Sequence, residues 1–149
     1  MKESTQIAEA LLRQTGDAIQ SGEFDNFKDC FTLPQLVVTP LGQTEVTDTE
    51  GLRAIFDRVR WHYRGLGVTL MHREVLHSMF MDRNAILSVH MTQLFRHNSM
   101  VQKPHKALSK IIRRKGVWQI TQCDYAIKDS LRHNRALFGP HKKQKGFVS

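Results

Sequence analysis

The chain has 149 residues, of which 40% are hydrophobic and 24% charged, a composition typical of one ordinary globular domain. This length excludes a multidomain enzyme, and no apolar run approaches the roughly 18 residues that a membrane span needs. The segment from Met1 to Thr5 contains no apolar core of the kind found in secretory signals. We therefore expect a soluble, cytoplasmic protein. Its two cysteines, Cys30 and Cys123, are too few for a disulfide framework and are expected to be reduced.

The net charge is unevenly distributed. Residues 1–60 hold 6 Lys+Arg and 10 Asp+Glu, a net −4, whereas residues 61–149 hold 16 and 4, a net +12, which together give the formal +8. The basic residues concentrate in the stretch 103–115 and in the tail 139–149. We expect a single domain at 1–138 and a disordered tail after it. Such asymmetry suggests an anionic partner, although a solvated charged face is the commoner explanation.

The first part of the chain is predicted to be helical. Apolar residues recur at helical spacing over residues 4–21, with Ser4 as the N-cap and Gly22 just past the end. A short second helix fits residues 23–31, where phenylalanines recur every three or four positions, and Pro34 ends it.

A hairpin and a third helix are predicted next. Residues rich in β-branched side chains at 35–38 and 44–47, divided by a Pro-Leu-Gly turn, predict the hairpin. The sequence Thr-Asp-Thr-Glu that begins at Thr47 is a capping box, in which the Thr47 hydroxyl caps the following helix. Two glycines, Gly65 and Gly67, close that helix.

Extended stretches replace helical periodicity in the second part of the chain. A return to helix is predicted over 128–137. Helices followed by an antiparallel meander predict an α+β domain with the helices on one face of a curved sheet, which tends to form a cone with a cavity at its wide end. The predicted strands of the meander are 68–81, 85–96, 105–114 and 117–127.

Four short segments carry a recognisable pattern: Ser-Gly-Glu-Phe-Asp-Asn-Phe at 21–27, Thr-Glu-Gly-Leu-Arg-Ala-Ile-Phe at 49–56, Asp-Arg-Asn-Ala-Ile-Leu at 82–87 and Lys-Gly-Val-Trp-Gln-Ile at 115–120. Together they resemble the nuclear transport factor 2-like (NTF2-like) superfamily, in particular its SnoaL-like and ketosteroid-isomerase-like members. The resemblance covers about residues 4–127 and implies a cone-shaped, cystatin-like fold. The superfamily includes isomerases, dehydratases, cyclases, hydrolases and non-catalytic subunits, so the fold does not select an activity.

The last predicted strand contains one candidate for acid–base chemistry. Alternation places Trp118, Gln122 and Asp124 on one face, and in similar proteins the face with the tryptophan is usually the pocket side. Desolvation at the end of an apolar wall would make Asp124 a general base. The alternative is that Asp124 is exposed or paired with an arginine.

A second candidate is His90, which could form an acid–base dyad with Asp124. Its face of the strand also carries Ser88 and Thr92, a mixed set consistent with a pocket lining. The opposite face is more apolar and could instead lie under the helices, which would leave His90 on a dimer face. Tyr63 could hydrogen-bond a ligand carbonyl or be a core residue.

The favoured interpretation is a protein that binds a small hydrophobic molecule in the cone pocket, as an isomerase, dehydratase or cyclase with Asp124 and His90 as catalytic residues. The ligand would contact Tyr63, Trp118, Gln122, Ser88 and Thr92. Histidine spacing does not fit a metal site, and no glycine-rich phosphate loop is present, so no metal or cofactor is expected.

The alternative is a non-catalytic binding or assembly module whose basic strand and tail contact an anionic partner. The basic stretch lacks interleaved aromatic residues, which disfavours nucleic acid. In either case we expect a homodimer formed through the sheet and no membrane partner.

Overall fold

The computed structural model describes residues 2–127 and 130–139. Its element order agrees with the predicted order of helix, helix, hairpin, helix, meander and helix, with one additional short strand. The elements are α1 (Glu3–Ser21), α2 (Phe24–Lys28), β1 (Phe31–Thr39), β2 (Gly42–Val46), α3 (Thr49–Leu66), β3 (Leu70–Asp82), β4 (Ala85–Arg96), β5 (Ser99–Met100), β6 (His105–Arg114), β7 (Val117–Ala126) and α4 (Leu131–Phe138).

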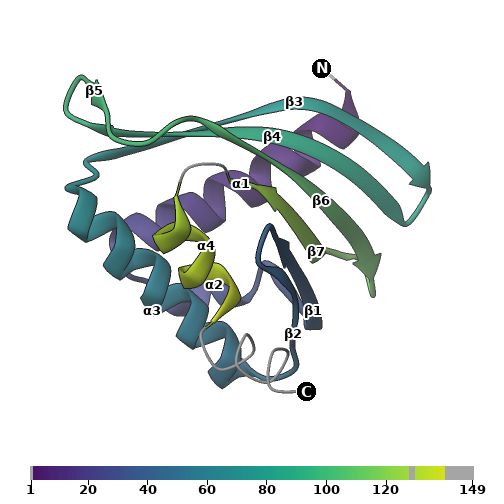
Figure 1. Cartoon of the computed structure of the whole chain (residues 1–149). Coiled ribbons are helices and arrows are strands. Elements are labelled where there is room, and N and C mark those ends of the chain that lie inside the picture. Colours follow the sequence, from purple (N-terminus) through teal and green to yellow (C-terminus); the bar gives the residue numbers. More distant parts are fainter. Residues whose placement is uncertain (1, 128–129, 140–149) are drawn as a thin grey trace.

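The strands form one sheet in the order β2-β1-β7-β6-β4-β3, with the short β5 paired to β4. The pairing of β1 with β7 is parallel, and the other described strand pairs are antiparallel. Figure 1 shows that the sheet curves and that the helices lie on its concave side. The predicted α+β architecture is therefore confirmed.

The parallel junction between β1 and β7 was not predicted. Helix α2 ends at Lys28, and β1 begins at Phe31, within the range expected to be helical. The Cys30 carbonyl accepts a hydrogen bond from the Ile120 amide at 2.7 Å, and Leu36 lies opposite Gln122. This long-range pairing, which no local pattern encodes, overrides the helical spacing of the phenylalanines.

Two helix starts differ from the prediction. Ser4 is not an N-cap but a buried residue of the first turn of α1, and its hydroxyl lies 2.9 Å from the Ser78 hydroxyl on β3. Helix α3 is capped by Asp48 rather than Thr47, because the Asp48 carboxylate accepts a hydrogen bond from the Gly51 amide at 2.8 Å. An aspartate is as good a cap as a threonine, so the helix begins one residue later than the capping box implied.

The predicted helix ends are confirmed at Gly22 and Gly67. Both glycines adopt a left-handed conformation, with φ of 86° and 72°, and their amides bond to carbonyls of the preceding turn. Gly65 lies inside α3. The reversal at Gly67 directs the chain from α3 into β3, so that one helix and one strand form adjacent walls of the interior.

The apolar core fills the space between the helices and the inner face of the sheet. The ring of Phe27 lies 4.7 Å from that of Phe31 and 4.9 Å from that of Phe56, centroid to centroid. Burying each such ring contributes roughly 1.5–3 kcal/mol to the free energy of unfolding. The core therefore holds α2, β1 and α3 together.

The segment after β7 is described only in part. The helix predicted over 128–137 corresponds to α4. The tail expected at 139–149 lies, apart from Gly139, outside the described residues. Among the helices of residues 2–127 and 130–139, none is long and apolar enough to cross a membrane.

Candidate functional site

An internal cavity of about 50 Å³ lies between the helices and the concave face of the sheet. Apolar side chains such as Ile19, Phe31 and Ile120 form much of its wall. None of the described residues that line it is an aspartate or a glutamate. The polar residues of the wall are Thr15, Gln35, Tyr63, Arg73, His90, Thr92, His105, Ser109, Cys123, Tyr125 and His133.

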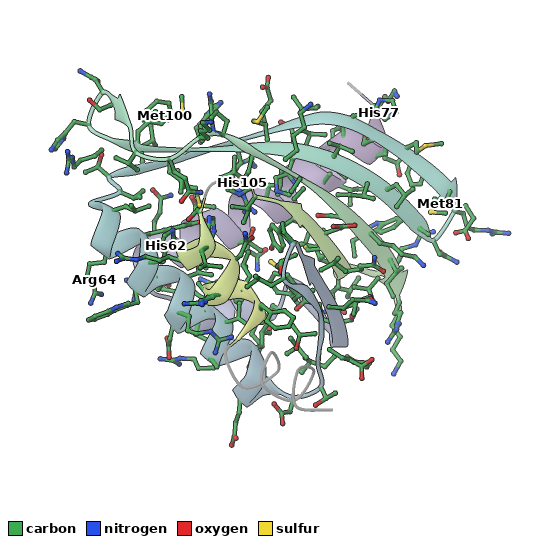
Figure 2. All side chains as sticks on the ribbon, in the orientation of Figure 1. His62, Arg64, His77, Met81, Met100 and His105 are labelled. Atoms are coloured by element: carbon green, nitrogen blue, oxygen red, sulfur yellow. The ribbon has the colours of Figure 1, made fainter. Side chains whose placement is uncertain are left out.

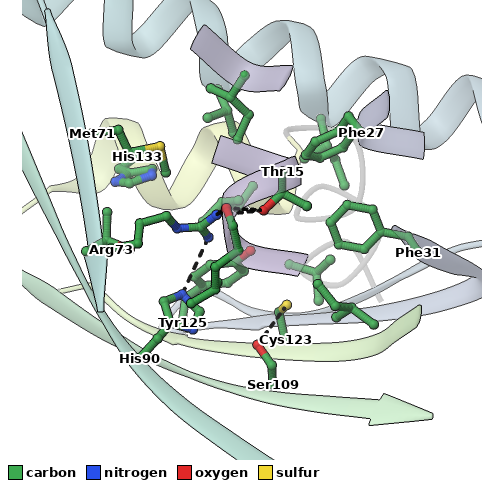
Figure 3. A pocket seen from close by; sticks show the side chains of 18 of the residues that line it. Thr15, Phe27, Phe31, Met71, Arg73, His90, Ser109, Cys123, Tyr125 and His133 are labelled. Atoms are coloured by element: carbon green, nitrogen blue, oxygen red, sulfur yellow. Dashed lines mark hydrogen bonds between the residues drawn. The ribbon is translucent and has the colours of Figure 1, made fainter. Parts of the chain in front are cut away.

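Arg73 on β3 reaches across the cavity toward α1 (Figure 3). Its Nη1 donates to the Thr15 hydroxyl at 2.7 Å and to the Leu12 carbonyl at 3.3 Å, and its Nη2 lies 3.5 Å from Nε2 of His90. The buried Nε has no hydrogen-bond partner. Within the described part of the chain, no carboxylate forms an ion pair with this guanidinium. Arg73 is therefore a cation held by neutral groups alone.

His90 on β4 is neutral because of its surroundings. The side chain is 2% exposed, and burial, followed by the charges of Arg73 and His105, lowers its pKa to about 2. The Arg73 guanidinium can only donate, so Nε2 of His90 is the acceptor of their contact. The single proton of the neutral ring is then on Nδ1, which has no partner.

His105 and Gln35 add two further unpartnered atoms. Burial, and then the charge of Arg73, lowers the pKa of His105 to about 4, and its Nδ1 has no hydrogen bond. The Oε1 of Gln35, on β1, is also unpartnered. We call Gln35, Arg73, His90 and His105 the arginine cluster. Of six buried, unpartnered side-chain atoms in the described residues, four belong to this cluster, so the unsatisfied polarity is concentrated in one cavity.

A second group, the α4 cluster of His62, Tyr63, Gln102 and His133, forms a continuous hydrogen-bonded chain. The His62 Nε2 lies 3.2 Å from the Gln102 Oε1, the Gln102 Nε2 lies 2.9 Å from the His133 Nδ1, and the His133 Nε2 lies 3.3 Å from the Tyr63 hydroxyl. With one proton on Nε2 of each histidine, every link has a donor and an acceptor. Gln102 thus connects the segment before β6 to α3 and α4.

The ionisation of the α4 cluster follows from the same burial. Desolvation lowers the pKa of His133 well below the usual value and lowers that of His62, while burial raises the pKa of Tyr63 to about 12. All three side chains are therefore uncharged near neutral pH. Figure 2 shows His62 on α3 and His105 on β6, and both rings pack against that of His133.

Three of the predicted site residues line the cavity: His90, Thr92 and Tyr63. The face of β4 that carries His90 is the buried one, which resolves the alternative that it faced a dimer partner. Ser88 lies on the same buried face, but it is not part of the cavity wall and its hydroxyl is unpartnered.

The predicted position of Asp124 in the pocket is wrong, and so is that of Trp118 and Gln122. Asp124 is exposed, and none of the three lines the cavity. Instead, the guanidinium of Arg113 lies over the Trp118 ring, with its central carbon 5.1 Å from the ring centroid. The proposed dyad of Asp124 with His90 does not exist in this structure.

A bulge in β7 explains the misplacement of Gln122 and Asp124. Gln122 pairs with Lys110, but Ile120 pairs with the adjacent Ile111, which leaves Thr121 as an extra residue. An extra residue reverses the alternation of side chains beyond it. Ile120 and Cys123 therefore both line the cavity, followed by Tyr125.

Sequence reasoning missed Arg73, His105, His133 and Tyr125. Arg73 shares a strand face with Met71 and Val75, so alternation alone would have placed a cation among inward apolar residues. His133 precedes Leu137 by one helical turn on the apolar side of α4. Both signals depend on knowing which face is inward, which the sequence did not indicate.

The comparisons with known proteins bear on the fold. No family model and no curated protein matches the sequence. A domain of unknown function with a cystatin-like fold from Nostoc punctiforme PCC 73102 is 16% identical, with a TM-score of 0.67 over 99% of this chain and 96% of that chain. An NTF2-like protein of unknown function from Shewanella oneidensis MR-1 is 12% identical, with a TM-score of 0.60 over 82% of this chain and 98% of that chain.

A ketosteroid isomerase-like protein from Erwinia carotovora atroseptica SCRI1043 is also similar in structure. It is 13% identical, with a TM-score of 0.61 over 87% of this chain and 100% of that chain. At these identities the likeness is evidence of fold and not of activity. The chain therefore has the cone-shaped, NTF2-like (cystatin-like) fold that its sequence resembles.

Proposed function

We propose that this protein binds a small molecule in the internal cavity and orients it by hydrogen bonds from the arginine cluster. The concentration of four unpartnered polar atoms in one cavity wall carries the proposal. Each buried polar atom without a partner costs about 1–3 kcal/mol, and such atoms are rare in folded proteins. A ligand that pairs with them would recover that free energy.

The volume limits the ligand. A water molecule needs roughly 10–15 Å³ of such space, so a cavity of about 50 Å³ holds only a few non-hydrogen atoms. Drug-sized ligands occupy cavities of about 300–1,000 Å³. A steroid-sized molecule would therefore require the walls to move, and the ligand that fits is small and partly apolar.

The chemistry of the wall favours binding over proton transfer by a protein carboxylate. A general base works best when its pKa is near the working pH. Asp124 is outside the cavity, and the burial that lowers the pKa of His90 to about 2 makes that ring a weak base. An isomerase, dehydratase or cyclase mechanism through these two residues has no support in this geometry.

A fragment screen by NMR with methyl-labelled methionines tests the proposal. Met71 lines the cavity, and the exposed Met81 is an internal control in the same spectrum. At least one fragment of on the order of five non-hydrogen atoms should shift the Met71 signal and leave Met81 unchanged.

A blocking variant supplies the second arm of this test. Val37→Phe adds bulk to the cavity wall and should abolish the shift, whereas Leu108→Phe, at an exposed position of β6, should not. If Val37→Phe does not fold, Ile120→Phe replaces it. A screen without any Met71 shift, or a folded blocking variant that binds as well as the parent, would refute ligand binding in the cavity.

We also propose a homodimer through the sheet. Large exposed apolar side chains occur mainly on strands, and Met81 and Met100 lie at opposite ends of the long strands (Figure 2). Exposed apolar area of this kind is often covered by a partner. Light scattering should give twice the chain mass, and Phe80→Asp should shift it toward the monomer; a monomer at all concentrations would contradict the proposal.

A further inference from the structure

We propose that the cavity ligand is a small carboxylate whose negative charge is held by Arg73. This inference rests on the proposed function and specifies the class of ligand. It follows from the absence of any anion beside Arg73 among the described residues, from a hydrogen-bond donor next to it, and from the size of the cavity.

Arg73 carries a positive charge that no described carboxylate neutralises. An arginine remains protonated in proteins, and Arg73 is half-buried with its Nε fully buried, so part of its charge is removed from water at a cost that an anion would offset. The three hydrogen-bond contacts of this guanidinium within the described residues are to a hydroxyl, a carbonyl and an imidazole, all neutral. The described residues therefore leave the charge uncompensated.

Two carboxylates border the same outer depression as Arg73 but do not supply the missing anion. Arg73 also borders a shallow outer depression of about 210 Å³, whose walls include Glu9 and Asp17 on α1. Neither carboxylate forms an ion pair with Arg73, and neither lines the internal cavity. The inner side of the guanidinium thus faces a wall that contains no acid.

Two hydrogen-bond donors of the arginine cluster have no acceptor among the described residues. Nε of Arg73 and Nδ1 of His90 each carry a proton and have no acceptor, and the two side chains contact each other through Nη2 and Nε2. A carboxylate has two oxygens that accept hydrogen bonds and no donor. It would satisfy both protons and neutralise the cation, which a neutral amide or alcohol cannot do.

The charges around the cavity are consistent with one negative charge. Arg73 is the cation of the described wall, and burial together with its positive field keeps the pKa values of His90 and His105 far below neutral. The histidines therefore add no charge near neutral pH. A dianion such as phosphate would leave one charge unpaired among apolar side chains.

The size of the cavity limits the carboxylate to a short one. A volume of about 50 Å³ admits a carboxyl group and a short chain, and residues such as Phe31, Val37 and Ile120 would surround the chain. Propionate, with five non-hydrogen atoms, has about this size and this polarity, and butyrate, one carbon longer, tests the upper limit of size. Propionamide has nearly the same shape as propionate without the charge, so the pair isolates the contribution of the anion.

The experiment is a titration of the full chain with propionate, butyrate and propionamide, in a buffer free of carboxylates and phosphate, followed by calorimetry and by the Met71 methyl signal. A charge-assisted hydrogen bond contributes about 1.5–3 kcal/mol, so propionate should bind roughly 10- to 100-fold more tightly than propionamide. Arg73→Gln should remove this preference, whereas Arg114→Gln, on the exposed end of β6, should keep it.

A matched variant separates charge from stability. Arg73→Gln also removes the bond to Thr15, so Thr15→Val deletes the same 2.7 Å bond while keeping the cation. The preference for propionate over propionamide should persist in Thr15→Val. If Arg73→Gln is unfolded, Arg73→Lys, which keeps the charge but loses Nε, should retain a reduced preference.

The outcomes separate this inference from the proposed function. Equal binding of propionate and propionamide, or a preference that survives in folded Arg73→Gln, would overturn the carboxylate assignment and leave ligand binding in the cavity intact. If neither probe shifts Met71 while a fragment of the screen does, the carboxylate assignment also fails and the cavity remains a binding site. If no compound of either set shifts Met71, both proposals fail.

Discussion

The arginine cluster lines the cavity, and the α4 cluster reaches the same cavity through Tyr63 and His133, but only the α4 cluster has all its polar side chains paired within the protein. In the α4 cluster, His62, Gln102, His133 and Tyr63 are joined by three hydrogen bonds. In the arginine cluster, four side chains each leave a polar atom unpartnered. Buried histidines alone therefore do not indicate a site. The two clusters differ in whether the protein supplies hydrogen-bond partners for them. We therefore assign a structural role to the α4 cluster and a ligand-binding role to the arginine cluster.

The largest expected effect is the loss of stability in acid. The folded-state pKa values of His90 and His105 are lowered from 6.5 to about 2 and about 4, so the unfolded chain takes up protons first. Their contribution to stability is complete above about pH 6.5 and declines as the pH falls below it. By about pH 4 each of the two histidines should lower the unfolding free energy by roughly 3 kcal/mol relative to its value at neutral pH.

Urea denaturation between about pH 7 and pH 4 measures this loss, because the midpoint follows the unfolding free energy. His90→Leu should flatten the pH dependence, and His77→Gln, at an exposed position of β3, should leave it unchanged. If His90→Leu is as acid-sensitive as the parent, His90 is not buried in its neutral form.

The next effect compares the clusters directly. His133→Leu removes two hydrogen bonds and leaves Gln102 and Tyr63 with unpaired groups, so it should lower the unfolding free energy by about 2–4 kcal/mol. His90→Leu removes only a 3.5 Å contact to Arg73 and should cost about 1 kcal/mol or less at neutral pH. Denaturation of both variants in parallel measures the difference, and a reversed order would contradict the assignment of structure to the α4 cluster.

A smaller effect is expected for Tyr63→Phe. The change keeps the ring in the core and deletes the hydroxyl that lies 3.3 Å from His133, so about 1 kcal/mol should be lost. Binding in the cavity should be nearly unaffected, because the arginine cluster is intact. Loss of binding with unchanged thermal stability would instead make Tyr63 a ligand contact.

The smallest effect is expected for Asp124→Asn. The side chain is exposed and lies outside the cavity, so stability should change by less than about 0.5 kcal/mol and ligand affinity should not change. Thermal unfolding and the propionate titration measure both quantities. A marked loss of binding would restore Asp124 as a site residue.

The strands that alternate without interruption could be predicted correctly from the sequence. On β4 every second residue from Ile86 to Leu94 is buried, and this regularity placed His90 and Thr92 together. On β7 the bulge at Thr121 depends on the register with β6, which is a long-range property. Alternation therefore failed beyond the bulge, at Gln122 and Asp124, whereas Trp118 precedes the bulge and lies outside the cavity for a different reason, its packing against Arg113.

Arg73 shows a second limit of sequence reasoning. The sequence places it on a strand, but its isolation from carboxylates is a property of the assembled wall, to which β3, β4, β6 and α1 contribute. The charge distribution along the sequence does not indicate Arg73, because the basic stretches that dominate the net charge lie elsewhere in the chain. Arg73, the one cation of the described cavity wall, therefore says more about the candidate site than the net charge of the chain does.

The parallel pairing of β1 with β7 also has a kinetic consequence. The strands β3, β4, β6 and β7 pair with neighbours along the chain, whereas β1 must meet β7 across the whole of α3 and the meander. Closing so long a loop opposes folding with an entropy that only the finished contacts offset. We therefore expect the meander to form first and the docking of β1 to limit the rate, so that the cavity is enclosed late in folding.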